Sequence, residues 1–175
     1  MNLYVLRHAS AGTSRANPLI DVKRPLDKEG KQQCLLIASY LNAINLQLDV
    51  IVSSPLKRAL QTASYVGNEI GFDGKIMISE ALAPAAGLPA FQKLIGDLAR
   101  YENALVVGHN PNLQQFLGAL VAMPRPASIR LRKGGIARVD MTRRPPTLNW
   151  LLDPRPLKAF QTSVTKSSRR KTSRK

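Results

Sequence analysis

Short apolar runs alternate with helix-like segments through the first 121 residues, and this alternation is the feature that most constrains the fold. Runs typical of buried strands lie at 3–6, 50–52, 75–78 and 104–107. Segments with a helical pattern lie at 27–44, 55–70, 89–100 and 112–121. Such alternation predicts an α/β fold, a three-layer α/β/α sandwich with a mostly parallel central sheet. In such sheets, ligands bind beyond the carboxyl ends of the strands.

The remaining segments complete the predicted organisation. Residues 129–141 and 147–152 resemble two late antiparallel strands, and residues 10–25, rich in Ser, Gly, Asn and Pro, predict a loop. From about Pro154 the alternation of apolar strands and helices ends, and Ser, Thr, Lys and Arg predominate. We therefore expect one domain over residues 1–153 and a basic, flexible tail over residues 154–175.

Composition excludes several classes of protein. Cys34 is the single cysteine, so no internal disulfide forms, and the two histidines rule out a histidine-rich zinc site. We expect no metal and no cofactor. No run of 18 apolar residues predicts a membrane span, and the first residues lack a secretory pattern. A cytoplasmic protein is therefore expected.

The chain is strongly basic, with 26 Lys and Arg against 11 Asp and Glu. Eight of the basic side chains lie within residues 155–175, which contain no acid. The rest of the chain is basic as well, and a basic surface favours anionic ligands. The tail is either a solvated, solubilising segment or a site for an anionic partner such as nucleic acid or lipid. It has no interleaved aromatic residues on which bases would stack.

The only two histidines each follow an apolar strand. His8 comes after the run at 3–6, directly behind Arg7, and His109 comes after the run at 104–107. Because parallel strands end at the same edge of a sheet, the two imidazoles are predicted to stand together where ligands bind. The plainer alternative is two unrelated histidines, one of them a core residue.

Three arginines are expected at the same edge. Arg58 lies about one turn into a helix whose N-terminus faces that edge, and a helix N-terminus favours an anion. Arg7 and Arg58 can each bind two phosphoryl oxygens at once, which lysine cannot do, and Arg24 is a third candidate from the loop. Alone, Arg58 would be interpreted as part of a solvated helix face. Neither a Walker-type phosphate loop nor a G-x-G-x-x-G motif is present, so side chains must hold any phosphate.

Three motifs in this order resemble the histidine phosphatase (phosphoglycerate mutase-like) superfamily: L-R-H-A at Leu6–Ala9, S-S-P-L-x-R-A-x-Q-T at Ser53–Thr62 and V-G-H-N-P at Val107–Pro111. The short chain and the Arg24-Pro25-Leu26 segment resemble its small SixA-type branch, the phosphohistidine phosphatases. The resemblance covers residues 1–153. Ala9 stands where many members have glycine, which narrows the space near His8 without removing a functional group.

The resemblance implies roles for these residues. His8 is the nucleophile that takes the phosphoryl group, Arg7 and Arg58 clamp its oxygens, His109 completes the pocket, and Arg24 is a further phosphate contact. Independently, the chemistry agrees, because phosphoryl transfer requires mainly positioning and charge stabilisation. A nucleophilic imidazole must be neutral, and nearby arginines lower its pKa.

The general acid is less well defined. Glu80 is the only acid at a suitable strand exit, and it is equally well interpreted as a solvated loop carboxylate. Without an acid the enzyme would favour good leaving groups, as in phosphohistidine. Residues 56–101 already contain two helices and a strand, which leaves little chain for a lid and suits a phosphorylated side chain on a folded protein.

We therefore expect a metal-independent phosphatase hydrolase that acts on phosphohistidine of a protein through a covalent phosphohistidine intermediate. Two alternatives stay open. One is a small-molecule phosphomonoesterase acting on a sugar or nucleotide phosphate. The other is a non-catalytic basic module that binds phosphate or nucleic acid, although such a module would not need a nucleophile.

Overall fold

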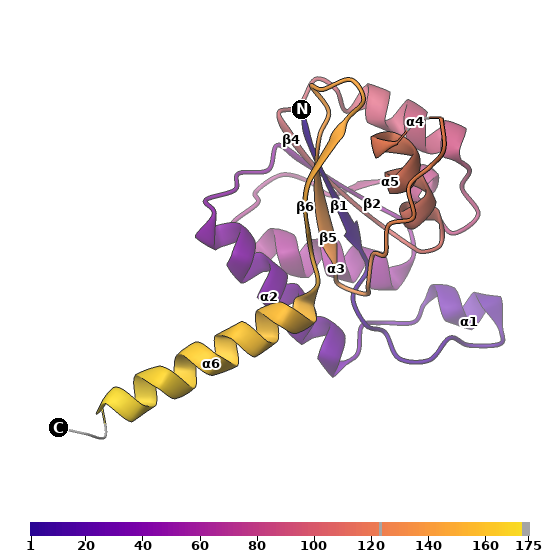
Figure 1. The fold of residues 1–175 in the computed structure, drawn as a ribbon. Helices are drawn as coiled ribbons and strands as arrows, with labels where there is room; N and C mark the ends of the chain where they lie inside the picture. The colour runs from indigo at the N-terminus through magenta and orange to yellow at the C-terminus, as the bar shows by residue number, and fades with distance from the viewer. Residues whose placement is uncertain (123, 173–175) are drawn as a thin grey trace.

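The computed structural model describes residues 1–122 and 124–172, with side chains as far as Ser163. Six strands form one sheet in the order β3-β2-β4-β1-β5-β6 (Figure 1). Their bounds are β1 Asn2–Arg7, β2 Val50–Ser53, β3 Met77–Ile78, β4 Asn103–Gly108, β5 Ile136–Asp140 and β6 Thr147–Leu152. The first four strands pair in parallel, while β5 runs antiparallel to β1 and β6 antiparallel to β5. The predicted mostly parallel sheet with late antiparallel strands is confirmed.

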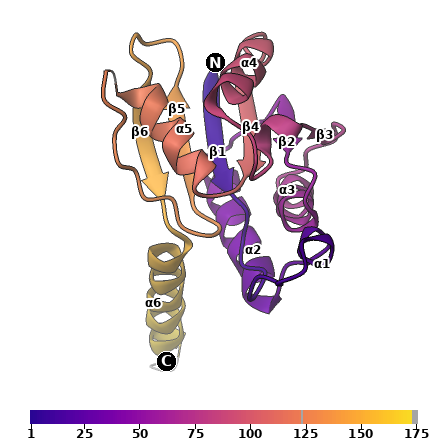
Figure 2. The same cartoon turned by 90° about the vertical axis from the view of Figure 1, so that its right-hand side faces the viewer.

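Helices cover both faces of this sheet (Figure 2). The helices are α1 Pro18–Val22, α2 Lys28–Ala43, α3 Lys57–Glu69, α4 Leu88–Asp97, α5 Asn112–Val121 and α6 Pro154–Thr172, with one 3₁₀ turn, η1, at Glu80–Leu82. α4 and α5 pack on one face, and α2 and α3 pack on the other. The predicted three-layer α/β/α arrangement is therefore confirmed.

Side-chain alternation along β1 explains the two cores. Leu3 and Val5 point to the α4 and α5 side, whereas Tyr4 and Leu6 point to the α2 and α3 side. All four are buried, as expected for a central strand covered on both faces. On the first side, the rings of Phe91 (α4) and Phe116 (α5) stack with centroids 4.5 Å apart.

The register of β1 and β4 fixes the place of the functional residues. Arg7 pairs with Gly108, so the residues that follow them leave the sheet side by side. The backbone N–H of His8 donates to the carbonyl of Gly108 at 3.0 Å, which extends this alignment by one residue. The carboxyl ends of two adjacent parallel strands thus deliver His8 and His109 to one point.

Several predicted elements differ in extent. The third strand has only two residues, and β5 begins at Ile136 instead of residue 129. Gly134 has a φ of 67°, a left-handed conformation that interrupts an extended strand, and residues 129–135 therefore form a loop. The helix predicted from residue 55 begins at Lys57, because Leu56 is its extended N-cap.

Two helices lie where the sequence predicts none. Asn17 caps α1 by accepting the N–H of Leu19, and Pro18 occupies the first turn, which turns part of the expected loop into a short helix. At the start of α6, Asp153 accepts the N–H of Arg155 at 3.0 Å. This contact supplies a helix start in the expected tail.

α6 projects away from the sheet, beside α2 at its beginning (Figure 1). The division of the chain at residue 153 stays a prediction, and the basic side chains of residues 166–175 lie outside the described residues. No helix of the described part is long and apolar enough to cross a membrane.

Candidate active site

The two histidines lie together at the carboxyl edge of the sheet. Their ring centroids are 4.9 Å apart and the rings are tilted by 53°. Both residues are buried, with 7% of His8 and 3% of His109 exposed. The prediction that they stand side by side is confirmed, and the alternative of two unrelated histidines is wrong.

His8 is held in one tautomer. Its Nδ1 lies 2.8 Å from the carbonyl oxygen of Ala9. A carbonyl only accepts, so Nδ1 carries the proton and the neutral ring has its lone pair on Nε2. Burial, with the nearby guanidinium groups of Arg58, Arg7 and Arg24 adding to it, lowers the pKa of His8 to about 3, against a smaller opposing effect of the Ala9 hydrogen bond. The imidazole is therefore neutral at physiological pH.

His109 is neutral as well. Burial, followed by the nearness of His8 and of the arginines, lowers its pKa to about 3. Its Nε2 lies 2.8 Å from the hydroxyl oxygen of Ser54, at the end of β2. Its Nδ1 is buried and has no hydrogen-bond partner among the described residues.

Arg7 is fixed by the loop at 129–135. Its Nη1 donates to the carbonyl of Leu131 at 3.1 Å, and its own carbonyl accepts the N–H of Gly134 at 3.1 Å. Leu131 is buried, so it anchors the loop against the sheet. The Nδ2 of Asn110, the residue after His109, donates to the same Leu131 carbonyl at 2.7 Å. The sequence predicts a strand here, and no sequence pattern indicates that this loop belongs to the site.

Arg24 and Arg58 converge on one carboxylate. Asp21 in α1 accepts from Nε of Arg24 at 2.8 Å and from Nη1 of Arg58 at 3.1 Å. The hydrogen bond from Arg24 is the main cause that lowers the pKa of Asp21 to about 2. Nη1 of Arg24 also donates to the carbonyl of Ala11 at 2.7 Å. The structure thus brings both arginines near His8. It also adds Asp21, which no sequence pattern marks because the residue lies in a segment predicted to be a loop.

Two further motif residues hold the strand exit in place. Thr62, on the buried face of α3, donates its hydroxyl to the carbonyl of Arg58 and accepts the N–H of Ala9 at 3.0 Å. Gln61 accepts the N–H of Leu26 at 2.8 Å and so anchors the segment that carries Arg24. The Q-T ending of the second motif was therefore a signal for these positioning contacts.

The N-cap and the N-terminal half of α2 secure the residues after His8. Gln33 accepts the N–H of Ser10 at 2.9 Å, and Asp27 accepts the Ser10 hydroxyl at 2.8 Å. A Cβ at Gly30 would lie 2.0 Å from the carbonyl oxygen of Ser10. Only glycine allows the helix and the loop to approach this closely.

Three buried nitrogen atoms of the site have no hydrogen-bond partner among the described residues: Nε of Arg7, Nε of Arg58 and Nδ1 of His109. Such atoms are rare in proteins because each loses its hydration without compensation. The arginine atoms are permanent donors, and an oxyanion beside His8 would satisfy them. Oδ1 of Asn110 is also unpaired, but as an acceptor it does not belong to this set.

Glu80 lies in η1, at the carboxyl edge next to β2, and it is exposed. Its carboxylate makes no hydrogen bond or ion pair with any residue that the structure describes. Among the described residues, no three His, Cys, Asp or Glu side chains form a cluster that would bind a metal ion.

Comparisons with known proteins agree with this geometry. The sequence model of the histidine phosphatase superfamily (branch 1) matches residues 3–83, which include the first two motifs. An uncharacterized protein of Picosynechococcus sp. is 34% identical over 142 residues, covering 78% of this chain and 82% of that protein. The phosphohistidine phosphatase SixA of Escherichia coli (strain K12) is 26% identical over 168 residues, covering 90% of this chain and 97% of SixA.

Solved structures show the same fold. A structure of the protein histidine phosphatase SixA complexed with tungstate superposes with a TM-score of 0.80 at 24% sequence identity. The match covers 90% of this chain and 99% of that one. The likeness therefore extends well beyond the residues matched by the sequence model.

Proposed function

The chain belongs to the histidine phosphatase superfamily, in its small SixA-type branch, and we propose that it removes the phosphoryl group from phosphohistidine on a protein, with His8 as covalent nucleophile. One observation carries the proposal. The His8 imidazole is neutral, is fixed through Nδ1 and lies among arginines whose buried Nε atoms have no partner. A site that only bound phosphate would not need this nucleophile.

The reaction proceeds in two steps. The lone pair on Nε2 of His8 attacks phosphorus, and the bond between phosphorus and the substrate nitrogen breaks. The substrate imidazole, protonated on its other nitrogen, leaves as a neutral ring. Water then attacks phosphorus, the bond to Nε2 breaks, and inorganic phosphate is released. The Ala9 carbonyl keeps the Nδ1 proton in place through both steps, because its oxygen lies 2.8 Å from Nδ1 and accepts that proton in a hydrogen bond.

The arginines stabilise the charge on the transferring group. Nε of Arg7 and Nε of Arg58 are buried donors without partners, so they are preorganised to bind the equatorial oxygens. The SixA structure holds tungstate, a tetrahedral oxyanion of comparable shape, and we expect tungstate to bind this chain at the same place.

His109 supplies a further donor. The hydroxyl oxygen of Ser54 accepts the N–H of Leu56 at 3.4 Å, and its own proton is then available to Nε2 of His109. In that tautomer Nδ1 carries the proton and donates to the phosphoryl group. A neutral His109 can therefore donate to the oxyanion without placing a second positive ring beside His8.

Among the described residues, no acid is held in position to protonate a leaving group, and this favours a labile substrate. Asp21 is ionised, since its pKa lies at about 2, and it cannot donate a proton at neutral pH. Glu80 is exposed, and its carboxylate makes no hydrogen bond or ion pair with the residues that the structure describes. Imidazole leaves readily from phosphohistidine, whereas an alkyl alkoxide requires protonation. The site is therefore better suited to phosphohistidine than to a sugar phosphate.

Turnover of two substrates tests the proposal. An aryl phosphate and a phosphohistidine-bearing protein are assayed with a chelator present, and His8→Ala serves as the control. We expect release of phosphate from both, faster from phosphohistidine, and loss of both in His8→Ala. A higher rate on sugar or nucleotide phosphates would indicate the small-molecule class. No release above the control from any of these substrates would contradict a phosphatase.

A further inference from the structure

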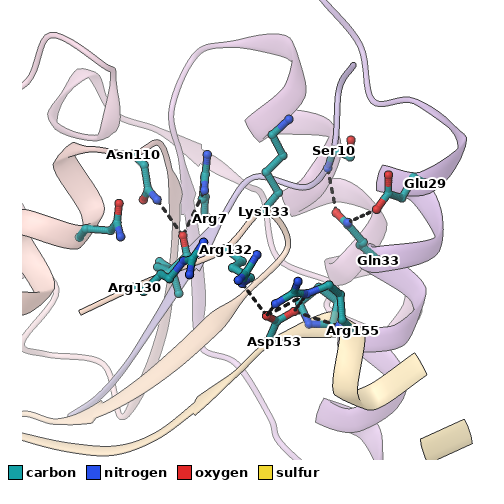
Figure 3. Close-up of a pocket in the computed structure, with 13 residues that line it drawn as sticks. Arg7, Ser10, Glu29, Gln33, Asn110, Arg130, Arg132, Lys133, Asp153 and Arg155 are labelled. Atoms are coloured by element: carbon teal, nitrogen blue, oxygen red, sulfur yellow. Dashed lines mark hydrogen bonds and ion pairs between the residues drawn. The ribbon is translucent and has the colours of Figure 1, made fainter. Parts of the chain in front are cut away.

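A basic cavity of about 380 Å³ lies next to the catalytic histidines and shares Arg7 with them (Figure 3). Five cationic and two acidic side chains line it: Arg7, Arg130, Arg132, Lys133, Arg155, Glu29 and Asp153. None of the residues beyond Arg7 is used in the reaction described above. The cavity therefore needs an explanation of its own.

The charges in the cavity are unevenly compensated. Asp153 pairs with Arg132 at 3.0 Å and with Arg155 at 2.8 Å, so one carboxylate serves two guanidinium groups. Oε1 of Glu29 accepts an amide N–H of Gln33 at 3.1 Å and pairs with none of the cations. The side chains of Arg130 and Lys133 make no hydrogen bond or ion pair with the described residues. Arg130 thus borders the cavity without an anionic partner, and Lys133 forms no ion pair, although its charge attracts the Asp27 carboxylate.

These two cations are held at the site by the loop that carries them. Leu131, between them in sequence, is buried beneath the loop, while Arg130 and Lys133 are exposed. The N–H of Gly134 donates to the carbonyls of Arg7 and His8, at 3.1 and 3.2 Å. The backbone of this loop is therefore joined directly to the residue that performs the chemistry.

Arg7 connects the cavity with the phosphoryl site. Its backbone adjoins His8, its Nε is one of the unpaired buried donors, and its side chain also lines the cavity. Figure 3 shows Arg7 between Asn110 and Lys133, with Arg130 and Arg132 drawn below it. The Arg7 side chain would thus lie between an anionic group in the cavity and the phosphoryl group on His8.

We propose that this cavity is a second anion-binding subsite, which receives a carboxylate side chain adjacent to the phosphohistidine of a protein substrate. The inference rests on the proposed function and specifies its substrate class. Arg130 and Lys133 would bind the carboxylate. The cavity suits one or two side chains from a protein surface, because three of its cationic residues, Arg130, Lys133 and Arg155, are exposed.

Peptide binding tests the subsite without depending on turnover. Two labelled peptides carry a non-hydrolysable analogue of phosphohistidine, flanked on each side by Glu in one and by Gln in the other. Their affinities are measured by fluorescence anisotropy at low salt. We expect the Glu peptide to bind roughly five- to tenfold more tightly, and this preference to shrink as salt screens the charges.

Two double variants assign the preference to the cavity. Arg130→Gln/Lys133→Gln should bring the affinity ratio of the two peptides close to one. Lys75→Gln/Arg100→Gln removes the same charge from exposed positions that precede β3 and β4, at the other edge of the sheet, and should retain the preference. Equal affinities in the unchanged protein, no measurable binding of either peptide, or a preference that persists in the cavity variant would overturn the subsite.

The two proposals can fail separately. Phosphate release that depends on His8, together with equal peptide affinities, would leave the phosphatase standing and remove the subsite. A Glu preference lost in the cavity variant, in a protein that releases no phosphate, would establish the subsite and remove the phosphatase.

Discussion

The imidazoles of His8 and His109 lie 4.9 Å apart between centroids, although 101 positions separate them in the sequence. Their proximity follows from the sheet, because each is the first residue after one of two adjacent parallel strands whose ends are in register. Burial and the same arginines keep both rings neutral. In the proposed mechanism, one ring thereby serves as the nucleophile and the other as a hydrogen-bond donor.

Replacement of Arg58 by lysine tests the clamp. A lysine keeps the charge but loses the planar fork and the buried Nε that lacks a partner. We expect Arg58→Lys to lower kcat/KM for an aryl phosphate by about 10²-fold. Lys57→Gln, at the exposed neighbouring position, is the matched control, and its kcat/KM should stay close to that of the unchanged enzyme. Comparable losses in the two variants would argue against a specific role for Arg58.

The neutral histidines make folding stability depend on pH. Both have a folded-state pKa of about 3, below the ordinary 6.5, so the unfolded chain binds more protons in this range. Their contribution to the free energy of unfolding is fully present above pH 6.5 and is lost as the pH falls from there toward 3. Each histidine should lower the free energy of unfolding by about 1.4 kcal/mol per pH unit below about 6.5.

Urea unfolding at pH 7.5 and pH 5.5 measures this loss. The double variant His8→Asn/His109→Asn cannot take up these protons. Between the two pH values its free energy of unfolding should therefore fall by about 2–3 kcal/mol less than that of the unchanged protein. Asp21 and Asp27 have lowered pKa values and titrate below this window. Equal pH dependence in the two proteins would show that the histidines already titrate normally.

Asp21→Asn tests the carboxylate that faces two arginines. The change keeps the shape of the side chain but removes a negative charge that pairs with Arg24 and Arg58. Because this charge repels an oxyanion, we expect tungstate to inhibit Asp21→Asn at several-fold lower concentration. Weaker inhibition would mean that Asp21 acts mainly by holding the arginines in place.

Glu80→Gln distinguishes substrate classes. Since we propose that no acid protonates the leaving group, we expect Glu80→Gln to lose no more activity on an alkyl phosphate than on phosphohistidine. A loss about 10²-fold larger on the alkyl phosphate would identify Glu80 as a general acid. The ratio of the two kcat/KM values is the readout, since a change in folding would affect both alike. An unchanged ratio would assign Glu80 to the solvated surface, which agrees with its exposure.

The sequence was informative where local pattern and topology coincide. Alternating strands and helices predicted the layers, and the strand exits predicted that His8, His109, Arg7 and Arg58 converge. The roles of these residues remain predictions, although their positions agree with the structure. Thr62 was visible as part of a motif, but its contact with Ala9 depends on how α3 packs and cannot be derived from spacing.

Other features depend on tertiary contacts that no local pattern reveals. Asp21 lies in a segment whose polar composition indicates a loop, and its importance arises from two arginines distant in sequence. The loop with Arg130 and Lys133 contains enough apolar residues to resemble a strand. Only the left-handed Gly134 and the hydrogen bonds to the end of β1 turn it into part of the site.

Detection of phosphate on His8 is the most direct test of the central claim. The enzyme is mixed rapidly with a labile phosphoryl donor, quenched in base, which preserves phosphohistidine, and digested for mass spectrometry. We predict one phosphoryl group on the peptide that contains His8, none on the peptide that contains His109, and none in His8→Asn. Phosphate release without a phosphoryl group on His8, or with the group on another residue, would contradict the covalent mechanism.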